Sequence, residues 1–137
     1  MTIQIQVTGV DQVIANLGII SEKANQAGRV ATVRAMDAIM GVSQQRCPRG
    51  VTGYLERSHF VDEYDEGELY SVIAGYSAEY AIYVHEMLDP TELGNPVHWT
   101  KPGSGPKFLE DPFNESSGNI PSYVANAIKD SLIGGIS

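Results

Sequence analysis

The alanine-rich stretch between residues 24 and 42 constrains the fold most, because it is long, periodic and followed by a clear stop signal. Its apolar residues recur at spacings of three and four, which predicts one long helix with a single apolar face. That predicted face comprises Ala24, Ala27, Ala31, Ala35, Ala38, Ile39 and Val42. Ser21 is a candidate N-cap, and the helix should end near Arg46 because Pro48 disfavours helical geometry at Cys47. Small side chains allow a close approach, so we expect the helix to lie flat across a sheet.

Alternating polarity predicts the strands of that sheet. Ile3, Ile5 and Val7 alternate with polar residues, a period of two that indicates a half-buried strand. Residues 60–64 and 69–75 alternate in the same way, and a short acidic, glycine-containing segment separates them. This arrangement predicts a β-hairpin.

The remaining elements are expected to be short helices and one long loop. A helix with Asp11 as its N-cap should end at Gly18, and residues 80–87 fit one or two helical turns. A C-terminal helix should begin with Pro121 in its first turn. Its predicted apolar face comprises Tyr123, Val124, Ala127, Ile128 and Leu132. The segment 88–105 is rich in proline and glycine and predicts a long loop.

These elements predict an α+β fold with a small antiparallel or mixed sheet. A long helix would pack on one sheet face, and a C-terminal helix would complete the helical layer. With 137 residues, of which 42% are hydrophobic and 19% charged, the chain is expected to form a single domain over 1–137.

Charge is distributed unevenly within the net value of −8. Residues 1–55 carry five basic and three acidic side chains, a balance of +2, whereas residues 56–137 carry four basic and fourteen acidic ones, a balance of −10. A subunit polarised in this way suits head-to-tail protein contacts and repels DNA phosphates, although a merely solvated acidic surface explains it equally well. Specific nucleic-acid binding is not expected, because phosphate contacts need clustered Lys and Arg.

Other sequence signals point to synthesis inside the cell. No apolar run approaches the ~18 residues of a membrane span, and the N-terminus does not have the basic and apolar regions of a signal peptide. Cys47 is the single cysteine and cannot form an intramolecular disulfide.

Candidate chemical groups are few. His85, Glu86 and His98 offer metal-ligand types but not the HExxH spacing, so a structural or interface role is the stronger interpretation. Ser58 and His59 are adjacent, an arrangement that rarely builds a catalytic triad. Cys47 precedes a proline at the end of a predicted helix and is interpreted as a buried small residue. No cofactor is expected.

Three short motifs follow the long helix in order. They comprise Pro48, Thr52, Gly53, Leu55 and Ser58, then Tyr80, Ala81, Tyr83, Val84 and His85, then Lys107, Phe108, Leu109 and Pro112. This series resembles a family of small neck, minor-tail and tail-completion proteins of tailed bacteriophages, which includes tail-terminator-like proteins. The chain departs from the family pattern by one extra residue between Pro48 and Thr52. A longer, proline-rich insertion between Met87 and Gly105 is a second departure.

The resemblance implies a non-enzymatic virion protein, made in the host bacterial cytoplasm. Such proteins form a homo-oligomeric ring, hexameric or alternatively dodecameric, at the head–tail junction. The ring would cap the tail tube and dock it to the head connector or adaptor proteins, with DNA passing through its lumen and no membrane involved. A minor capsid or head-completion protein is the first alternative, and a small metal-dependent hydrolase is the second.

The motif residues have two interpretations, as turn and core residues or as partner contacts. Aromatic residues such as Tyr80, Tyr83 and Phe108 favour the core. The long loop, with His98 and Trp99, is the expected intersubunit arm, since Trp is enriched among interface anchors.

Overall fold

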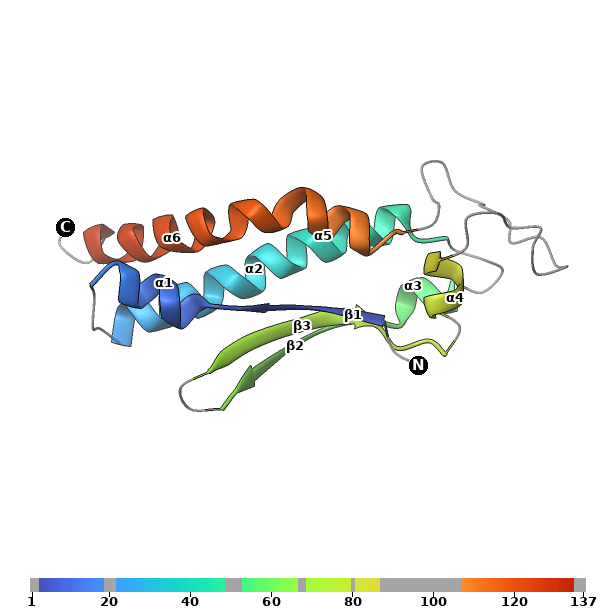
Figure 1. Cartoon of the computed structure of the whole chain (residues 1–137), viewed down its shortest axis with the longest axis horizontal. Helices are drawn as coiled ribbons and strands as arrows, with labels where there is room; N and C mark the ends of the chain where they lie inside the picture. Colours follow the sequence, from blue (N-terminus) through green and yellow to red (C-terminus); the bar gives the residue numbers. More distant parts are fainter. Residues whose placement is uncertain are drawn as a thin grey trace, which may run out of the picture.

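The computed structural model describes residues 3–18, 22–48, 53–66, 69–79, 81–86 and 107–134. Along the chain the elements are β1 (Ile3–Thr8), α1 (Val10–Asn16), α2 (Glu22–Arg46), α3 (Tyr54–Arg57), β2 (His59–Asp65), β3 (Tyr70–Tyr76), α4 (Ala81–Glu86), α5 (Glu110–Ser116), the 3-10 turn η2 (Ser117–Asn119) and α6 (Ile120–Gly134). The predicted α+β class is confirmed. A layer of helices lies along one face of a small sheet, and α3 and α4 lie at one end (Figure 1).

The sheet has three antiparallel strands in the order β1-β3-β2. The N-terminal strand therefore pairs with the return strand of the hairpin, with Ile5 opposite Ala74 and Val61 opposite Ala74 on the other side. Exposure alternates along β1, as its period of two predicted. The central strand β3 turns Tyr70, Val72, Ala74 and Tyr76 into the core, all of them fully buried. The sheet holds the hairpin and the N-terminus in one register.

The long helix runs from Glu22 to Arg46, so its predicted C-terminal end is confirmed. The predicted apolar face is only partly correct, because Ala38 and Val42 are exposed. The buried residues of α2 are Ala24, Gly28, Ala31, Thr32, Met36, Ile39, Met40 and Ser43. The helix packs against both β3 and α6, and these two contacts bury a face that overlaps the alanine stripe and extends beyond it.

Hydrogen bonds explain why polar residues are part of that buried face. The Ser43 hydroxyl lies 2.8 Å from the Tyr76 hydroxyl, and Thr32 Oγ1 donates to the Gly28 carbonyl at 2.8 Å. A buried polar group with a partner costs little, so serine and threonine fit a core position that a hydrophobicity pattern overlooks.

Three further details differ from the expectations. Asp11 is not an N-cap, because α1 begins after Gly9, which has φ +108°, and the Asp11 carboxylate instead accepts the Tyr70 backbone N–H at 3.2 Å. Helix α5 was not predicted at all. Tyr123 lies on α6 but is 45% exposed, whereas Val124 and Ile128 of the predicted face are buried.

The expected short helix at 80–87 is confirmed as α4.

Candidate functional site

The first motif forms a turn and a hydrogen-bonded link at the start of the hairpin. Gly53 adopts φ +70° and precedes α3, whose Leu55 side chain is buried. The Ser58 Oγ donates to the Leu55 carbonyl at 2.7 Å and accepts the Ala78 N–H at 3.2 Å, and the Ser58 carbonyl accepts the Ser77 N–H at 3.0 Å. The motif serine therefore joins α3 to the segment that leads from β3 into α4.

The third motif places the aromatic ring of Phe108 against Tyr76 and His85. Phe108 is fully buried and contacts Tyr76 edge-to-face, with ring centroids 5.2 Å apart, and His85 in the same manner at 5.1 Å. Leu109 and Pro112 beside it are also fully buried. A ring pair of this kind adds about 0.5–1.5 kcal/mol beyond the area that it buries.

His85 of the second motif is buried and uses both ring nitrogens. Its Nε2 accepts the backbone N–H of Glu110 at 3.1 Å, and its Nδ1 lies 3.0 Å from Glu86 Oε1. A backbone N–H can only donate, so Nε2 carries the lone pair and the proton of a neutral ring sits on Nδ1. His85 thus donates to Glu86 and accepts from the first residue of α5.

Lys107 joins the second and third motifs. Its backbone N–H donates to the His85 carbonyl at 2.7 Å, and its φ of +57° turns the chain into α5. Its Nζ forms ion pairs with Glu86 Oε2 and, at 3.2 Å, with Glu110 Oε2. The Lys107 ammonium, followed by the His85 hydrogen bond, lowers the pKa of Glu86, and the Glu86 carboxylate in turn raises the pKa of Lys107.

The second and third motifs are thus joined directly, and Ser58 links the first motif to the segment just before α4; we call the described residues of the three motifs the motif cluster. It comprises Pro48, Gly53, Leu55, Ser58, Ala81, Val84, His85, Lys107, Phe108, Leu109 and Pro112. Thr52, Tyr80, His98 and Trp99 lie outside the described residues, as does the predicted loop, and of Tyr83 only the helical backbone is described.

The cluster contains three residues of metal-binding type. Ligand atoms of His85, Glu86 and Glu110 all lie within 4.8 Å of one another. Several of their ligand atoms already have partners, however, because Nε2 accepts a backbone N–H, Nδ1 donates to Glu86, and one oxygen of each carboxylate pairs with Lys107. The donor set does not fit a resident metal ion without breaking these contacts.

The other candidate groups also have structural partners. Ser58 Oγ is engaged as described, and His59 Nδ1 lies 3.0 Å from both Gln44 Nε2 and the Glu56 carbonyl. Cys47 is fully buried, which agrees with its interpretation as a small core residue. The geometry brings together no nucleophile–base pair among the described side chains.

Two members of this environment were missed by sequence reasoning, Tyr76 and Glu110. The acidic first turn of α5, Glu110 and Asp111 followed by Pro112, is a helix-start signal that would have predicted α5 and hence the contact from Glu110. No local signal marks Tyr76 as the partner of Phe108, since the two residues meet only in the folded chain.

Comparison with models of known protein families, with curated protein sequences and with solved structures gives no match for this chain. Within the part of the chain that is described, no helix is both long enough and apolar enough to cross a membrane. Inference about function therefore depends on the residues and their packing.

Proposed function

We propose that this chain is a structural virion protein of a tailed bacteriophage. It would form a homo-oligomeric ring at the head–tail junction, as a neck, tail-terminator or tail-completion protein. The ring would cap the tail tube and dock it to the head connector. No chemical step is part of this proposal.

The convergence of the three motifs carries the proposal. These motifs bear the resemblance to the phage family, and they are separated by stretches of more than twenty residues in the sequence. In the folded chain the second and third motifs share contacts through Phe108, His85 and Lys107, and Ser58 of the first motif accepts the N–H of Ala78, just before the second motif. Residues that lie in the same region of the fold have a common structural reason to occur together. The presence of all three motifs in one chain is therefore harder to explain by chance than the presence of each motif alone.

The use of side chains in the motif cluster also supports an assembly role. Two of the side chains weighed for catalysis, His85 of the metal-dependent hydrolase and Ser58 of the Ser-His pair, are held by backbone groups. A catalytic base needs a free lone pair facing a substrate. Here the Nε2 lone pair faces the N-terminus of α5, so the motif histidine acts as a hydrogen-bonded link between α4 and α5.

The surface of the molecule is consistent with a ring. A ring requires that one face of a subunit bind a different face of its neighbour. Acidic residues are concentrated after residue 55 and the first 55 residues carry a small positive balance, an asymmetry along the chain that suits contacts between unlike parts of neighbouring copies.

Native mass spectrometry tests this function directly. The purified protein would be measured alone, with tail tubes and with connector complexes encoded by the same genome. We expect a closed ring, or a discrete number of copies bound only at tube ends. Tubes that already carry a terminator are the control and should bind no further copies.

Two other outcomes would assign a different role. Copies found on capsids but not on tubes would indicate a minor capsid or head-completion protein. A monomer that binds neither particle and retains a stoichiometric metal ion would contradict the proposal in favour of the hydrolase.

A further inference from the structure

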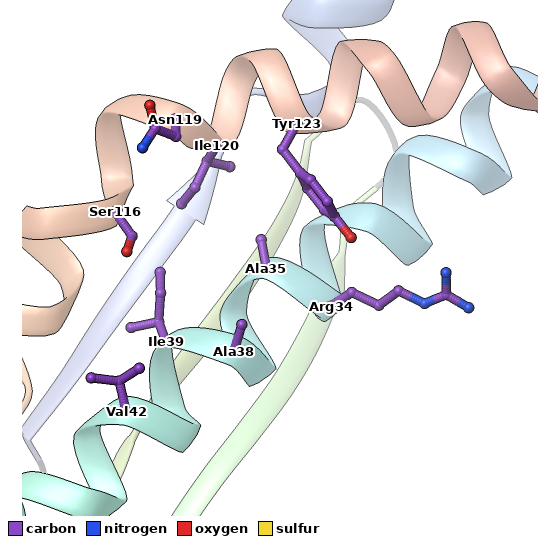
Figure 2. Close-up of a pocket in the computed structure, with 9 residues that line it drawn as sticks. All are labelled: Arg34, Ala35, Ala38, Ile39, Val42, Ser116, Asn119, Ile120 and Tyr123. Atoms are coloured by element: carbon purple, nitrogen blue, oxygen red, sulfur yellow. The ribbon is translucent and has the colours of Figure 1, made fainter.

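A shallow apolar groove of about 320 Å³ lies between α2 and the start of α6 (Figure 2). Ala38, Ile39 and Val42 line it from α2, and Ile120 and Tyr123 line it from α6. Val42 is 37% exposed and Tyr123 is 45% exposed. Large apolar side chains that remain open to water in one concave site are typical of an interaction surface.

One positive charge borders this groove. Arg34 is the single charged residue of the lining and projects beside Tyr123 (Figure 2). Its neighbours on α2 have partners, since Arg29 pairs with Asp65 at 2.5 Å and Arg46 with Glu115 at 2.9 Å. Among the described residues Arg34 has no such carboxylate. An occupant with apolar side chains and one carboxylate would complement the groove.

The end of the β2–β3 hairpin combines apolar residues with carboxylates, since its sequence carries Tyr64 and Leu69 together with Asp65, Glu66 and Glu68. Tyr64 is 46% exposed and Leu69 is 51% exposed, which makes Leu69 one of the two most exposed large apolar residues in the described part of the chain. Glu66 lies between them, and its backbone N–H donates to the Leu69 carbonyl at 2.9 Å. The Glu66 side chain is exposed, whereas the Asp65 carboxylate is held by Arg29.

The hairpin end and the groove belong to different sides of the molecule. The hairpin belongs to the sheet layer, and Asp65 near its end is held by Arg29 of α2, whereas the groove lies between α2 and α6 in the helical layer (Figure 1). One copy therefore presents its hairpin end and its groove to different neighbours. Two complementary but unlike surfaces on one chain define a heterologous contact, which repeats from copy to copy.

We infer that the hairpin end of one copy docks into the α2–α6 groove of a second copy. Leu69 would lie against Ala38 and Val42, and Glu66 would lie near Arg34. This inference rests on the proposed ring and names the contact that would build it. The occupant is a second copy because the same chain supplies both matching surfaces, in apolar character and in sign of charge.

Cysteine crosslinking tests the contact. Ala38→Cys and Leu69→Cys replace exposed residues, while the native Cys47 is buried and should not react. The two variants would be mixed and oxidised, both free and bound to tube ends. We expect a crosslinked dimer in the mixture and none in either variant alone, and a ladder of multimers from the double variant. Ala15→Cys, an exposed alanine of α1 outside the groove, is the matched control and should not crosslink with Leu69→Cys.

Charge reversal tests the proposed ion pair between Arg34 and Glu66. Arg34→Glu alone or Glu66→Arg alone should lower the crosslinking yield about fivefold, and the two reversals combined should restore it. The loss should shrink at high salt, because exposed charges are screened. Equal loss in the single and double reversals would exclude an Arg34–Glu66 pairing.

The outcomes separate this contact from the proposed function. Rings seen by native mass spectrometry without the 38–69 crosslink would overturn the contact and leave the ring standing. Crosslinked multimers that ignore tube ends would support the contact and count against the head–tail role. Crosslinks between two copies of Ala38→Cys would indicate a symmetric dimer and overturn the contact, and a protein that remains monomeric everywhere would overturn both.

Discussion

Gly75 shows how a single residue limits the sheet. It lies in the central strand between Gln4 of β1 and Phe60 of β2. A Cβ atom at this position would lie 1.9 Å from the Ile3 carbonyl oxygen and 2.7 Å from the Gln4 Cα. Both neighbours are backbone atoms, so the strand β1 itself would have to move. Glycine is therefore required by the close approach of two strands.

Replacing this glycine should be severe. We expect Gly75→Ala to reduce the free energy of unfolding by about 3 kcal/mol or more, because β1 must shift or detach. The measurement is chemical denaturation followed by circular dichroism. Gly41→Ala is the matched control, since Gly41 lies in α2 and its added Cβ would meet no atom within 4 Å beyond the adjoining backbone of the helix; it should stabilise by about 0.5–1 kcal/mol. Similar effects of the two substitutions would show that β1 does not approach Gly75 closely.

Glu86 should make the stability depend on pH. Its folded pKa is depressed by Lys107 and then by His85, so folding favours the ionised carboxylate. This contribution is fully present above the ordinary pKa of 4.5 and is lost as the pH falls through the lower folded value. We expect wild type to have a higher Tm than Glu86→Gln at neutral pH, and the difference to vanish in acid. The effect should be small, because the Glu86 side chain is half exposed.

A control variant shows whether the pH effect is specific to Glu86. Asp37→Asn removes an exposed acid of α2 that forms no ion pair with the described residues, so its Tm profile should follow wild type. A difference for Glu86→Gln that persists unchanged into acid would contradict the role of the ionised carboxylate.

At the scale of elements, α6 divides its apolar residues between core and surface. Ile128 is fully buried and packs close to Gly28 of α2, where a Cβ would lie 3.2 Å from it. Tyr123 belongs to the same periodic pattern but borders the groove. The apolar pattern of α6 thus serves two surfaces, the contact with α2 and the groove.

Two truncations separate these surfaces. Ile128→Ala should cost about 2–5 kcal/mol of unfolding free energy, because it leaves a cavity in the core. Tyr123→Ala should cost less than about 1 kcal/mol in the monomer, because its ring is already in contact with water. Denaturation at a concentration below that of assembly measures both. Equal losses would mean that Tyr123 is a core residue, as its periodicity alone suggests.

The short elements differ in how clearly the local sequence predicts them. The hairpin, α4 and the end of α2 were predicted because each has a local cause, namely alternation, helical spacing or a following proline. Helix α5 was missed because its seven residues have only one turn of apolar periodicity, and its partner groups on α2 and α4 are distant in sequence. The Arg46–Glu115 ion pair, which joins α2 to α5, could not be foreseen for the same reason.

On the scale of the whole molecule, the helical layer and the sheet share one core. Helix α2 contacts the sheet on one side and α6 on another, and the motif cluster closes the end where α3, α4 and α5 meet. Arg29 fastens α2 to the hairpin by its ion pair with Asp65 and by stacking 4.6 Å from the Tyr70 ring. Burial, followed by the nearby charge of Glu63, raises the pKa of Tyr70 to about 12. The ion pair and the ring contact thus join the hairpin to α2 of the helical layer.

The sequence by itself determined the element types, the α+β class and the set of motif residues, because periodicity, turn residues and proline act within a few residues of chain. The tertiary structure alone decided which face of α2 is buried, which nitrogen of His85 carries the proton, and that Tyr123 and Val42 border a groove. Those outcomes depend on which segments become neighbours in space. A helix with two packing partners buries whatever side chains face them, and a histidine adopts the tautomer that its distant hydrogen-bond partners require.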